Sequence, residues 1–289
     1  METALTKLLG CRYPIIAGPM FLVSEETLTA AVCKTGATAA MPSLNWRNAE
    51  LFRAAIQKTK TLAGGAPFGV NLIVNKANPR IEEDLEICVE EKVPFIITSL
   101  GNPKNVIEKM HTVGSKVFCD VTTLEYAKKV EALGADAVIA VSSGAGGHAG
   151  SISPLVLIPY LKRNISIPII AAGGIACGEQ MAAALVLGAE GVQLGTRFIA
   201  SQEAQVSIEY KKAILNAAPE DIIMTTKISG TPAAVIKTPQ LEKAIESSSW
   251  KDVWSAGQSA GLIEDILPVS EIVEKLIREC KDAFQRKPL

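Results

Sequence analysis

The sequence has 289 residues, with 29 basic and 30 acidic side chains and a formal net charge of −1. Hydrophobic residues make up 48% and charged residues 20%, which supplies a large core and argues against disorder. The near-zero charge leaves no basic surface for nucleic acid and no polybasic patch for a membrane. Because there are only two histidines, a His-rich metal site is nearly excluded, and we expect no metal.

The cysteines and the N-terminus bear on the cellular compartment. The six cysteines are dispersed, and no two have the CxxC spacing of a zinc knuckle or a redox pair. Dispersed thiols fit a reducing compartment. The first ten residues, METALTKLLG, lack the apolar core and cleavage site of a secretory signal. We therefore expect a cytoplasmic protein that does not enter a membrane.

Eight short apolar runs alternate with longer amphipathic stretches along the chain. The runs are Pro14–Pro19, Ala37–Pro42, Phe68–Ile73, Phe95–Leu100, Lys116–Val121, Ala137–Ser143, Pro168–Gly174 and Gly191–Phe198. They are continuously apolar, as strands buried on both faces of a parallel sheet are. Eight strand–helix units at a period of about 25 residues predict an α/β fold, a (β/α)8 TIM barrel. An open doubly wound sheet is the alternative, but the first run ends in Ala17-Gly18-Pro19-Met20, which lacks its GxGxxG fingerprint.

The stretches between the runs carry helix signals. Asn78-Pro79 and Asn102-Pro103 predict an N-cap followed by proline at the first helical position. Thr122–Glu125 fits a capping box in which Glu125 reaches back to the cap. Glycines predict left-handed helix ends shortly before three of the runs, at Gly36, Gly134 and Gly188.

The pattern changes after the eighth run. Residues 201–217 can form a helix, residues 219–268 look irregular, and Val269–Phe284 has the spacing of an amphipathic helix. We therefore expect residues 1–217 to form the barrel core and residues 218–268 to form an appended lid-like segment. Residues 269–289 are expected to form a C-terminal helix that closes on the barrel.

In a barrel of this kind the active site lies at the C-terminal ends of the strands. The seventh run ends in Ala171–Ile175 and the eighth in Gln193–Arg197, and both ends contain glycine. Loops after strands seven and eight form the usual phosphate site of these barrels, where exposed backbone N–H groups bind the anion. The alternative is that these glycines only form tight turns. Two glycine sites at the two appropriate strand ends favour phosphate binding.

The two histidines lie in different settings. His148 belongs to Gly144–Gly150, which follows the sixth run and holds four glycines in seven residues. Such a loop can present an imidazole to a substrate as a general base or as a cationic partner. The alternative is a surface turn with a solvated histidine. His111 lies near the end of a predicted helix, where it is expected only to interact with the helix dipole.

Three other strand-end residues are candidates. Asn71 carries a donor and an acceptor, which suits the edge of a heterocycle. Asp120 has two readings of equal weight: a base or hydrogen-bond anchor, or a cap for the following helix. Met20 is a candidate for covering one face of a ring, although core methionines are commoner.

Several motifs together resemble the nitronate monooxygenases, formerly called 2-nitropropane dioxygenases, and the closely similar flavin-dependent enoyl-acyl carrier protein reductases. The matching motifs are Tyr13–Ile16, Phe68–Asn71, Gly134–Val138, Ala145–His148, Ala171–Ile175, Gly191–Phe198 and Ala256–Gln258. The resemblance covers essentially the whole chain.

The resemblance implies one non-covalent FMN at the barrel mouth, with His148 as the active-site histidine. By position, Gly18, Pro19, Met20 and Asn71 would line the flavin. The residues expected around the ribityl chain and phosphate are Gly146, Gly147, Gly173, Gly174, Gln193, Leu194, Gly195 and Thr196. Asp120 completes the expected cofactor-binding set.

The chain departs from relatives in the loop after the sixth run. Val141 stands where relatives usually have glutamine, Gly144 where they have glutamate, and Ala149 where they have arginine or isoleucine after the histidine. Val141 removes one flavin contact, and Gly144 removes a carboxylate and loosens the loop. The resemblance therefore implies the cofactor more firmly than the substrate.

We expect an FMN-dependent oxidoreductase of the nitronate monooxygenase type, which oxidises alkyl nitronates with O2 to a carbonyl compound and nitrite. The alternative is an enoyl-thioester reductase that uses NAD(P)H and FMN. A third hypothesis is a barrel that binds FMN or another phosphate without turnover. The expected partner is a small molecule, and the sequence leaves a homodimer as one alternative for the assembly.

Overall fold

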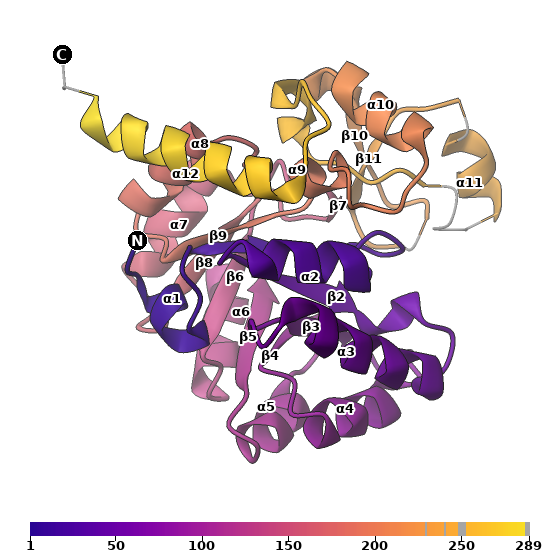
Figure 1. Ribbon diagram of the computed structural model, residues 1–289, viewed down its shortest axis with the longest axis vertical. Helices are drawn as coiled ribbons and strands as arrows, with labels where there is room; N and C mark the ends of the chain where they lie inside the picture. Colours follow the sequence, from indigo (N-terminus) through magenta and orange to yellow (C-terminus); the bar gives the residue numbers. More distant parts are fainter. Residues whose placement is uncertain (229, 240, 248–252, 287–289) are drawn as a thin grey trace.

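The computed structural model describes residues 1–228, 230–239, 241–247 and 253–286. Eight parallel strands close into a barrel in which the last strand pairs with the first (Figure 1). In barrel order they are β1 (Ile15–Ala17), β2 (Thr38–Pro42), β3 (Gly69–Ile73), β4 (Phe95–Ser99), β5 (Lys116–Val121), β6 (Ala137–Val141), β8 (Ile169–Ala172) and β9 (Gly191–Leu194). The predicted TIM barrel is confirmed, and the open sheet is excluded because the β1–β9 pairing closes the ring.

A helix follows each barrel strand, and the helices that follow the first seven strands cover the outside of the barrel (Figure 1). The eight helices are α2 (Glu26–Lys34), α3 (Ala49–Ala63), α4 (Ile81–Glu90), α5 (Lys104–His111), α6 (Leu124–Ala132), α7 (Pro154–Lys162), α8 (Gly178–Val186) and α9 (Thr196–Ile199). The eighth apolar run, Gly191–Phe198, forms a strand only up to Leu194, because its last residues belong to α9. Of the helices that the structure describes, none is long and apolar enough to cross a bilayer.

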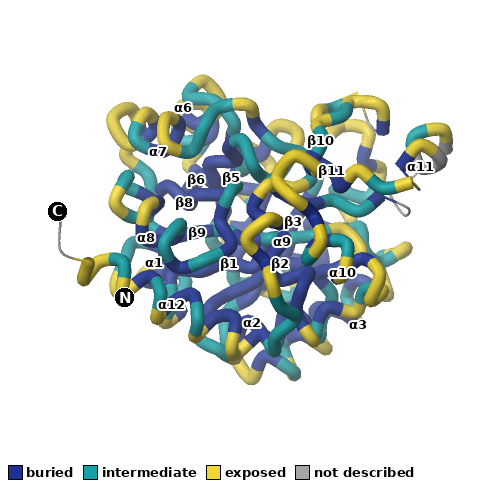
Figure 2. Tube along the Cα trace, turned by 90° about the horizontal axis from the view of Figure 1, so that it is seen from above, coloured by how far each residue is buried: buried dark blue, intermediate teal, exposed yellow. Residues whose placement is uncertain are grey.

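The barrel interior is filled and its N-terminal end is closed. Phe95 and Phe118 lie inside with ring centroids 5.5 Å apart, in a cluster of fully buried side chains. The N-terminal helix α1 (Ala4–Leu9) places Leu5 in the same cluster. A Cβ on Gly191 would lie 2.4 Å from Leu5 Cδ2, so glycine is needed for this close approach. The strands are the most buried part of the molecule (Figure 2). Because the N-terminal end of the barrel is closed, a site is expected at the end where the strands terminate.

The helix boundaries differ from the predictions in detail. The helices α4 and α5 begin at Ile81 and Lys104, and the predicted caps Asn78 and Asn102 instead accept hydrogen bonds from backbone N–H groups two residues on. The predicted capping box is half wrong. Thr123 caps α6, but the Glu125 carboxylate pairs with Lys129 in the next turn rather than with the cap. The three helix-ending glycines do adopt positive φ, as predicted.

A small antiparallel sheet lies beside the barrel mouth. It has the order β10 (Ile222–Thr225), β11 (Ala233–Ile236) and β7 (Gly147–His148). The prediction that residues 219–268 are irregular is therefore wrong in part. Strands this short show no usable periodicity, and β7 comes from a loop far upstream in the sequence.

The remaining elements surround this sheet and the barrel rim (Figure 1). They are α10 (Ile208–Asn216), α11 (Leu241–Ser247), the 3-10 turns Ser43–Asn45, Pro219–Asp221 and Gln258–Leu262, and α12 (Val269–Gln285). The amphipathic helix predicted at Val269–Phe284 is confirmed by α12. The division at residues 217 and 268 stays a prediction, and residues 229, 240, 248–252 and 287–289 lie outside the described part of the chain.

Candidate active site at the barrel mouth

The parallel strands bring the predicted site residues to one end of the barrel. Gly18, Pro19 and Met20 follow β1, Asn71 lies on β3, and Asp120 lies on β5. Gly146, Gly147 and His148 belong to the strand-six loop, which we define as residues 142–153 between β6 and α7. Gly173 and Gly174 follow β8, Gln193 and Leu194 end β9, and Gly195 and Thr196 start the next turn.

Three glycines in left-handed conformations form a backbone cradle between the strand-six loop and the turn after β8. Gly144, Gly173 and Gly174 have φ values of +86°, +107° and +73°. The Gly174 N–H donates to the Gly144 carbonyl at 3.2 Å. A Cβ on Gly173 would lie 2.9 Å from the backbone nitrogen of Ala145. The two loops therefore meet through bare backbone, which is how proteins form an anion-binding surface without cationic side chains.

A third segment, residues 256–258, locks this arrangement. The Gly257 N–H donates to Thr196 Oγ1 at 2.9 Å, and the Gln258 N–H donates to the Gly144 carbonyl at 3.1 Å. A Cβ on Gly257 would lie only 2.3 Å from that same carbonyl oxygen. The predicted set of site residues missed Gly257, although it lies in one of the resembling motifs.

The segment 256–258 is itself held firmly against the barrel. The Tyr210 hydroxyl donates to the Ser255 carbonyl at 2.6 Å, and the Tyr210 ring stacks on Trp254 at 5.3 Å. Arg197 is buried and donates to the carboxylate and the carbonyl of Asp265, both at 2.8 Å. Arg197 is thus committed to holding the C-terminal part of the chain rather than to the mouth.

His148 is fixed in the small sheet rather than on a free turn. It lies on β7 opposite Ala233 of β11 and is half-buried. Burial lowers the pKa of His148 below its ordinary value of 6.5, so the imidazole is neutral at pH 7. His111 lies far from the mouth: its Nε2 contacts the Asp136 carboxylate at 2.8 Å, next to the N-terminal ends of β5 and β6.

Asn71 and Asp120 are linked through Ser99, across three adjacent strands. Asn71 Nδ2 donates to Ser99 Oγ at 2.8 Å, and Ser99 Oγ donates to Asp120 Oδ2 at 2.5 Å. Burial raises the pKa of Asp120 to about 6, against a smaller lowering by the Ser99 hydrogen bond. The suggestion that Asp120 caps the following helix is wrong, because Thr123 caps α6. Ser99 lies at a strand end, which is a candidate position in such a barrel, but it was not in the predicted set of cofactor-binding residues.

Gln193 and Met20 line the opposite side of the mouth. A Cβ on Gly18 would lie 3.1 Å from Gln193 Cγ, so that glycine makes room for the glutamine. Gln193 Oε1 is buried and accepts no hydrogen bond from any residue that the structure describes. Met20 Sδ lies 3.4 Å from the position of a Cβ on Gly195, which places the thioether beside the turn after β9.

Positive charge is unevenly distributed around this mouth, because the loops after β2 and β3 contain Arg47, Lys76 and Arg80. The loops that follow β1, β4, β5, β6 and β8 contain no lysine or arginine. Of those five loops, only the strand-six loop contains a histidine, His148, which is neutral at pH 7. A ligand with an anionic group must therefore be bound there largely by backbone N–H groups.

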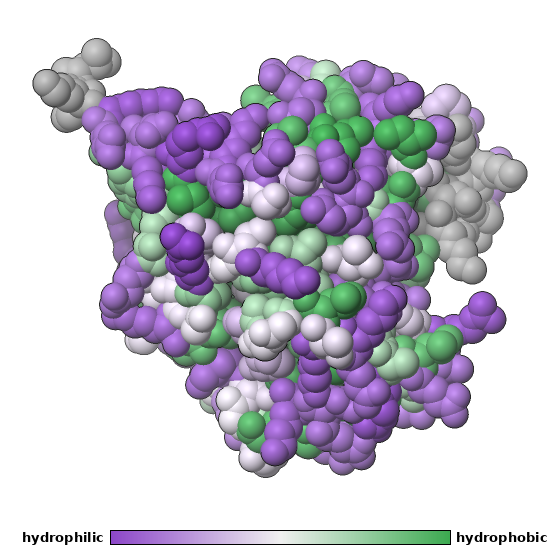
Figure 3. Space-filling model, in the orientation of Figure 1, coloured by the Kyte–Doolittle hydropathy of each residue, from purple (hydrophilic) through white to green (hydrophobic). Residues whose placement is uncertain are grey.

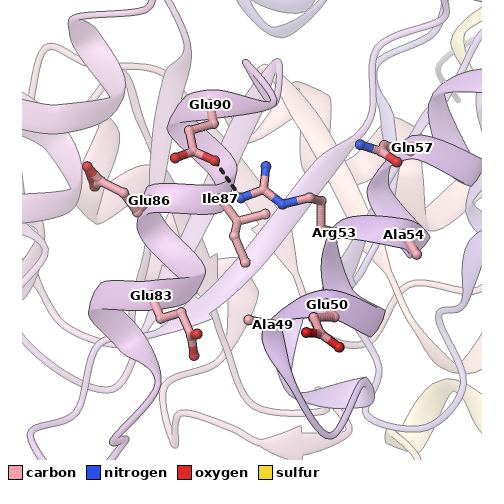
Figure 4. A pocket seen from close by; sticks show the side chains of 9 residues that line it. All are labelled: Ala49, Glu50, Arg53, Ala54, Gln57, Glu83, Glu86, Ile87 and Glu90. Atoms are coloured by element: carbon pink, nitrogen blue, oxygen red, sulfur yellow. Dashed lines mark hydrogen bonds and ion pairs between the residues drawn. The ribbon is translucent and has the colours of Figure 1, made fainter.

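A separate groove lies on the outer ring of helices, between α3 and α4 (Figure 4). It has a volume of about 460 Å³ and is lined by Ala49, Glu50, Arg53, Ala54, Gln57, Glu83, Glu86, Ile87 and Glu90. Arg53 points across it to the Glu90 carboxylate. Hydrophilic side chains also cover the surface over α4 (Figure 3). This groove shares no residue with the mouth.

Comparison with known proteins gives a consistent picture. Residues 2–251 match the family model described as nitronate monooxygenase. A Rhodococcus jostii (3aS,4S,5R,7aS)-5-hydroxy-7a-methyl-1-oxo-octahydro-1H-indene-4-carboxyl-CoA dehydrogenase is 32% identical over 90% of this chain and 72% of its own length. A Paraburkholderia phytofirmans nitronate monooxygenase is 29% identical over 99% of this chain and 97% of its own.

Among solved structures, FabK from Thermotoga maritima, an enoyl-acyl carrier protein reductase, superposes with a TM-score of 0.92. The two are 36% identical over 99% of this chain and 98% of FabK, so they have nearly the same length. The alignment with the Paraburkholderia enzyme instead spans 358 positions, more than the 289 residues of this chain. That relative therefore carries added segments.

Proposed function

Because the chain belongs to the nitronate monooxygenase family, we propose that it is an FMN-dependent oxidoreductase that exchanges hydride with an acyl thioester. The observation that carries the proposal is the mouth itself. It combines a backbone cradle for a phosphate with a neutral histidine, and the loops after β1, β4, β5, β6 and β8 contain no lysine or arginine. This combination suits a phosphorylated cofactor and an uncharged reacting group.

The residues at the mouth fit FMN. Gly144 and Gly173 let the two loops meet closely, and Gly174, where an added Cβ would meet nothing within 4 Å, leaves open space for a phosphate near Thr196. Gln193 Oε1 and Asp120 Oδ1 are buried oxygens without a partner among the described residues, and such oxygens suit hydroxyl or ring N–H donors. Gly18, Pro19, Met20 and Asn71 would hold the ring, with Gly146, Gly147, Gly173, Gly174 and Gln193 to Thr196 along the ribityl chain and phosphate.

Bound FMN would supply the redox chemistry, and the chain's own residues would orient the substrate. His148, held by the β7–β11 pairing, is neutral at pH 7 and can take a proton from the carbon beside a thioester carbonyl or return one to it. A thioester carries no charge at its reacting end, so it needs no cation at the mouth. Both the Rhodococcus dehydrogenase and FabK act on thioesters, which supports this substrate class.

Nitronate oxidation is the second candidate. The family model and the name of the Paraburkholderia relative favour it. Its substrate is an anion, and the loops after β1, β4, β5, β6 and β8 offer no lysine or arginine to bind it, while burial lowers the pKa of His148 and favours its neutral form. This is why we favour the thioester.

A cytoplasmic location and a homodimeric assembly stay predictions.

The two candidates predict opposite results in one comparison. The purified holoprotein is mixed anaerobically with NADH or NADPH and then with crotonyl-CoA, and in a separate cell with propyl nitronate in air. We expect the reduced nucleotide to bleach the flavin band, crotonyl-CoA to restore it, and the nitronate to cause little oxygen uptake. Bleaching of the flavin band by a saturated acyl-CoA would equally support an acyl thioester as the substrate. Oxygen uptake that depends on the nitronate, without any response to thioesters, would contradict the proposal, and silence toward both would favour a non-catalytic barrel.

A further inference from the structure

Three neighbouring strands end in a single chain of hydrogen bonds that leads to one carboxyl group. Asn71 on β3 donates to Ser99 on β4, and Ser99 donates to Asp120 on β5. Asn71 Nδ2 also donates to the Ile97 carbonyl at 3.0 Å, which fixes the orientation of the amide. Both hydrogen bonds point toward Asp120, so the chain ends on its carboxyl group. A carboxyl group held in this way can keep or release a proton without moving.

The surroundings of this carboxyl group are apolar and uncharged. Asp120 lies opposite Ile139 on β6, and Oδ1 is buried without a partner among the described residues. Its own strand contributes Cys119, whose thiol is neutral because burial raises its pKa to about 12. Burial raises the pKa of Asp120, the Ser99 hydrogen bond lowers it by less, and no lysine, arginine or histidine is among the groups that shift it. Asp120 itself is half-buried, and a carboxyl oxygen buried without a counter-ion is costly, which is typical of groups with a function.

We propose that Asp120 is a redox-linked proton acceptor, which takes up one proton from solvent when negative charge builds up on the flavin bound at the mouth. This inference rests on the FMN proposed above. The proton balance is simple: two electrons enter the flavin from the reductant, and the Asp120 carboxylate becomes a carboxylic acid in the same step. Ser99 acts as a positioning residue, because its hydrogen bond stabilises the charged form of Asp120.

The reduction potential of the bound flavin, measured between pH 5 and pH 8.5, tests this directly. Each proton taken up with two electrons adds about 30 mV per pH unit to the slope. From about pH 6 up to the higher pKa that Asp120 takes on when the flavin is reduced, the wild type should be steeper than Asp120→Asn by about that amount, and outside this range the two slopes should converge. Glu50→Gln, which changes an exposed carboxylate on α3, is the matched control and should behave as the wild type.

Two further measurements keep the test decisive. Ser99→Ala keeps the carboxyl group but removes its hydrogen bond, so the change of slope should move to higher pH. The reduced-minus-oxidised infrared difference spectrum should gain a protonated-carboxyl band that is absent from Asp120→Asn. If Asp120→Asn does not fold, Ser99→Ala still tests the inference. A change of slope at the same pH in Ser99→Ala as in the wild type would contradict it.

The possible failures are distinguishable. Equal slopes in the wild type and Asp120→Asn, with FMN bound to both, overturn the role of Asp120 and leave the proposed function intact. A protein that binds no FMN overturns the proposed function, and the inference falls with it.

Discussion

Replacement of His148 by alanine is expected to lower turnover by roughly 10²- to 10⁴-fold while FMN stays bound, because a positioned proton donor or acceptor contributes about that much. The backbone of His148 is held on β7 by its pairing with Ala233 of β11, which fixes the point from which the imidazole projects. The measurement is kcat with the preferred thioester, together with the flavin content of the purified variant. Unchanged kinetics would remove His148 from the mechanism.

The only other histidine provides a matched control. His111 pairs with Asp136 at the closed end of the barrel, so His111→Ala should leave kcat and flavin content unchanged. The pH profile gives a second check. Since burial lowers the pKa of His148, the neutral base persists as the pH falls through 6.5, and activity should decline only below that value. The comparison is best made in Asp120→Asn, because Asp120 titrates near pH 6 in the wild type.

Gly257→Ala is expected to weaken FMN binding by about 10- to 100-fold and to lower turnover by about 10²-fold. The new Cβ would lie 2.3 Å from the Gly144 carbonyl oxygen, and that atom is backbone, so the strand-six loop must shift. Overpacking of this kind costs about 1–3 kcal/mol, and a displacement of about 1 Å at a reacting group costs about 10²-fold in rate. The measurements are the dissociation constant for FMN and kcat.

Gly64→Ala separates this effect from a general cost of replacing glycine. Gly64 ends α3 with a φ of +62° and has nothing within 4 Å of an added Cβ. The variant should lose about 1 kcal/mol of stability through backbone strain, without any change in FMN affinity. Normal FMN affinity in Gly257→Ala would show that residues 256–258 do not hold the cradle.

The barrel itself was predictable because continuous apolar runs and helix-ending glycines are local signals. Each of the eight runs contains a barrel strand, and the glycine before β2, at Gly36, has φ +93°. The small sheet was not predictable. Its strand β7 has only two residues, and β11 lies more than eighty residues further along the chain. Pairings of this kind depend on tertiary contacts that no local pattern encodes.

The candidate site divides in the same way. The position of His148, Asn71 and the glycines at the barrel mouth was predictable because active sites of such barrels lie at the strand ends, and their roles stay predictions. Ser99 and Gly257 were missed, since their importance comes from a hydrogen bond to Asp120 and from a close approach to Gly144. Glu125 shows the opposite case. The capping-box motif correctly predicts a helix start, but the Glu125 carboxylate pairs with Lys129 and not with the cap.

The central claim is that the glycine cradle holds the phosphate of FMN. Titration of the apoprotein with FMN and with riboflavin, followed by flavin fluorescence, tests it most directly. We expect one FMN per chain and at least about 100-fold weaker binding of riboflavin, because loss of the phosphate removes several charge-assisted hydrogen bonds from backbone N–H groups. Equal affinity for the two ligands, or no binding of either, would contradict it.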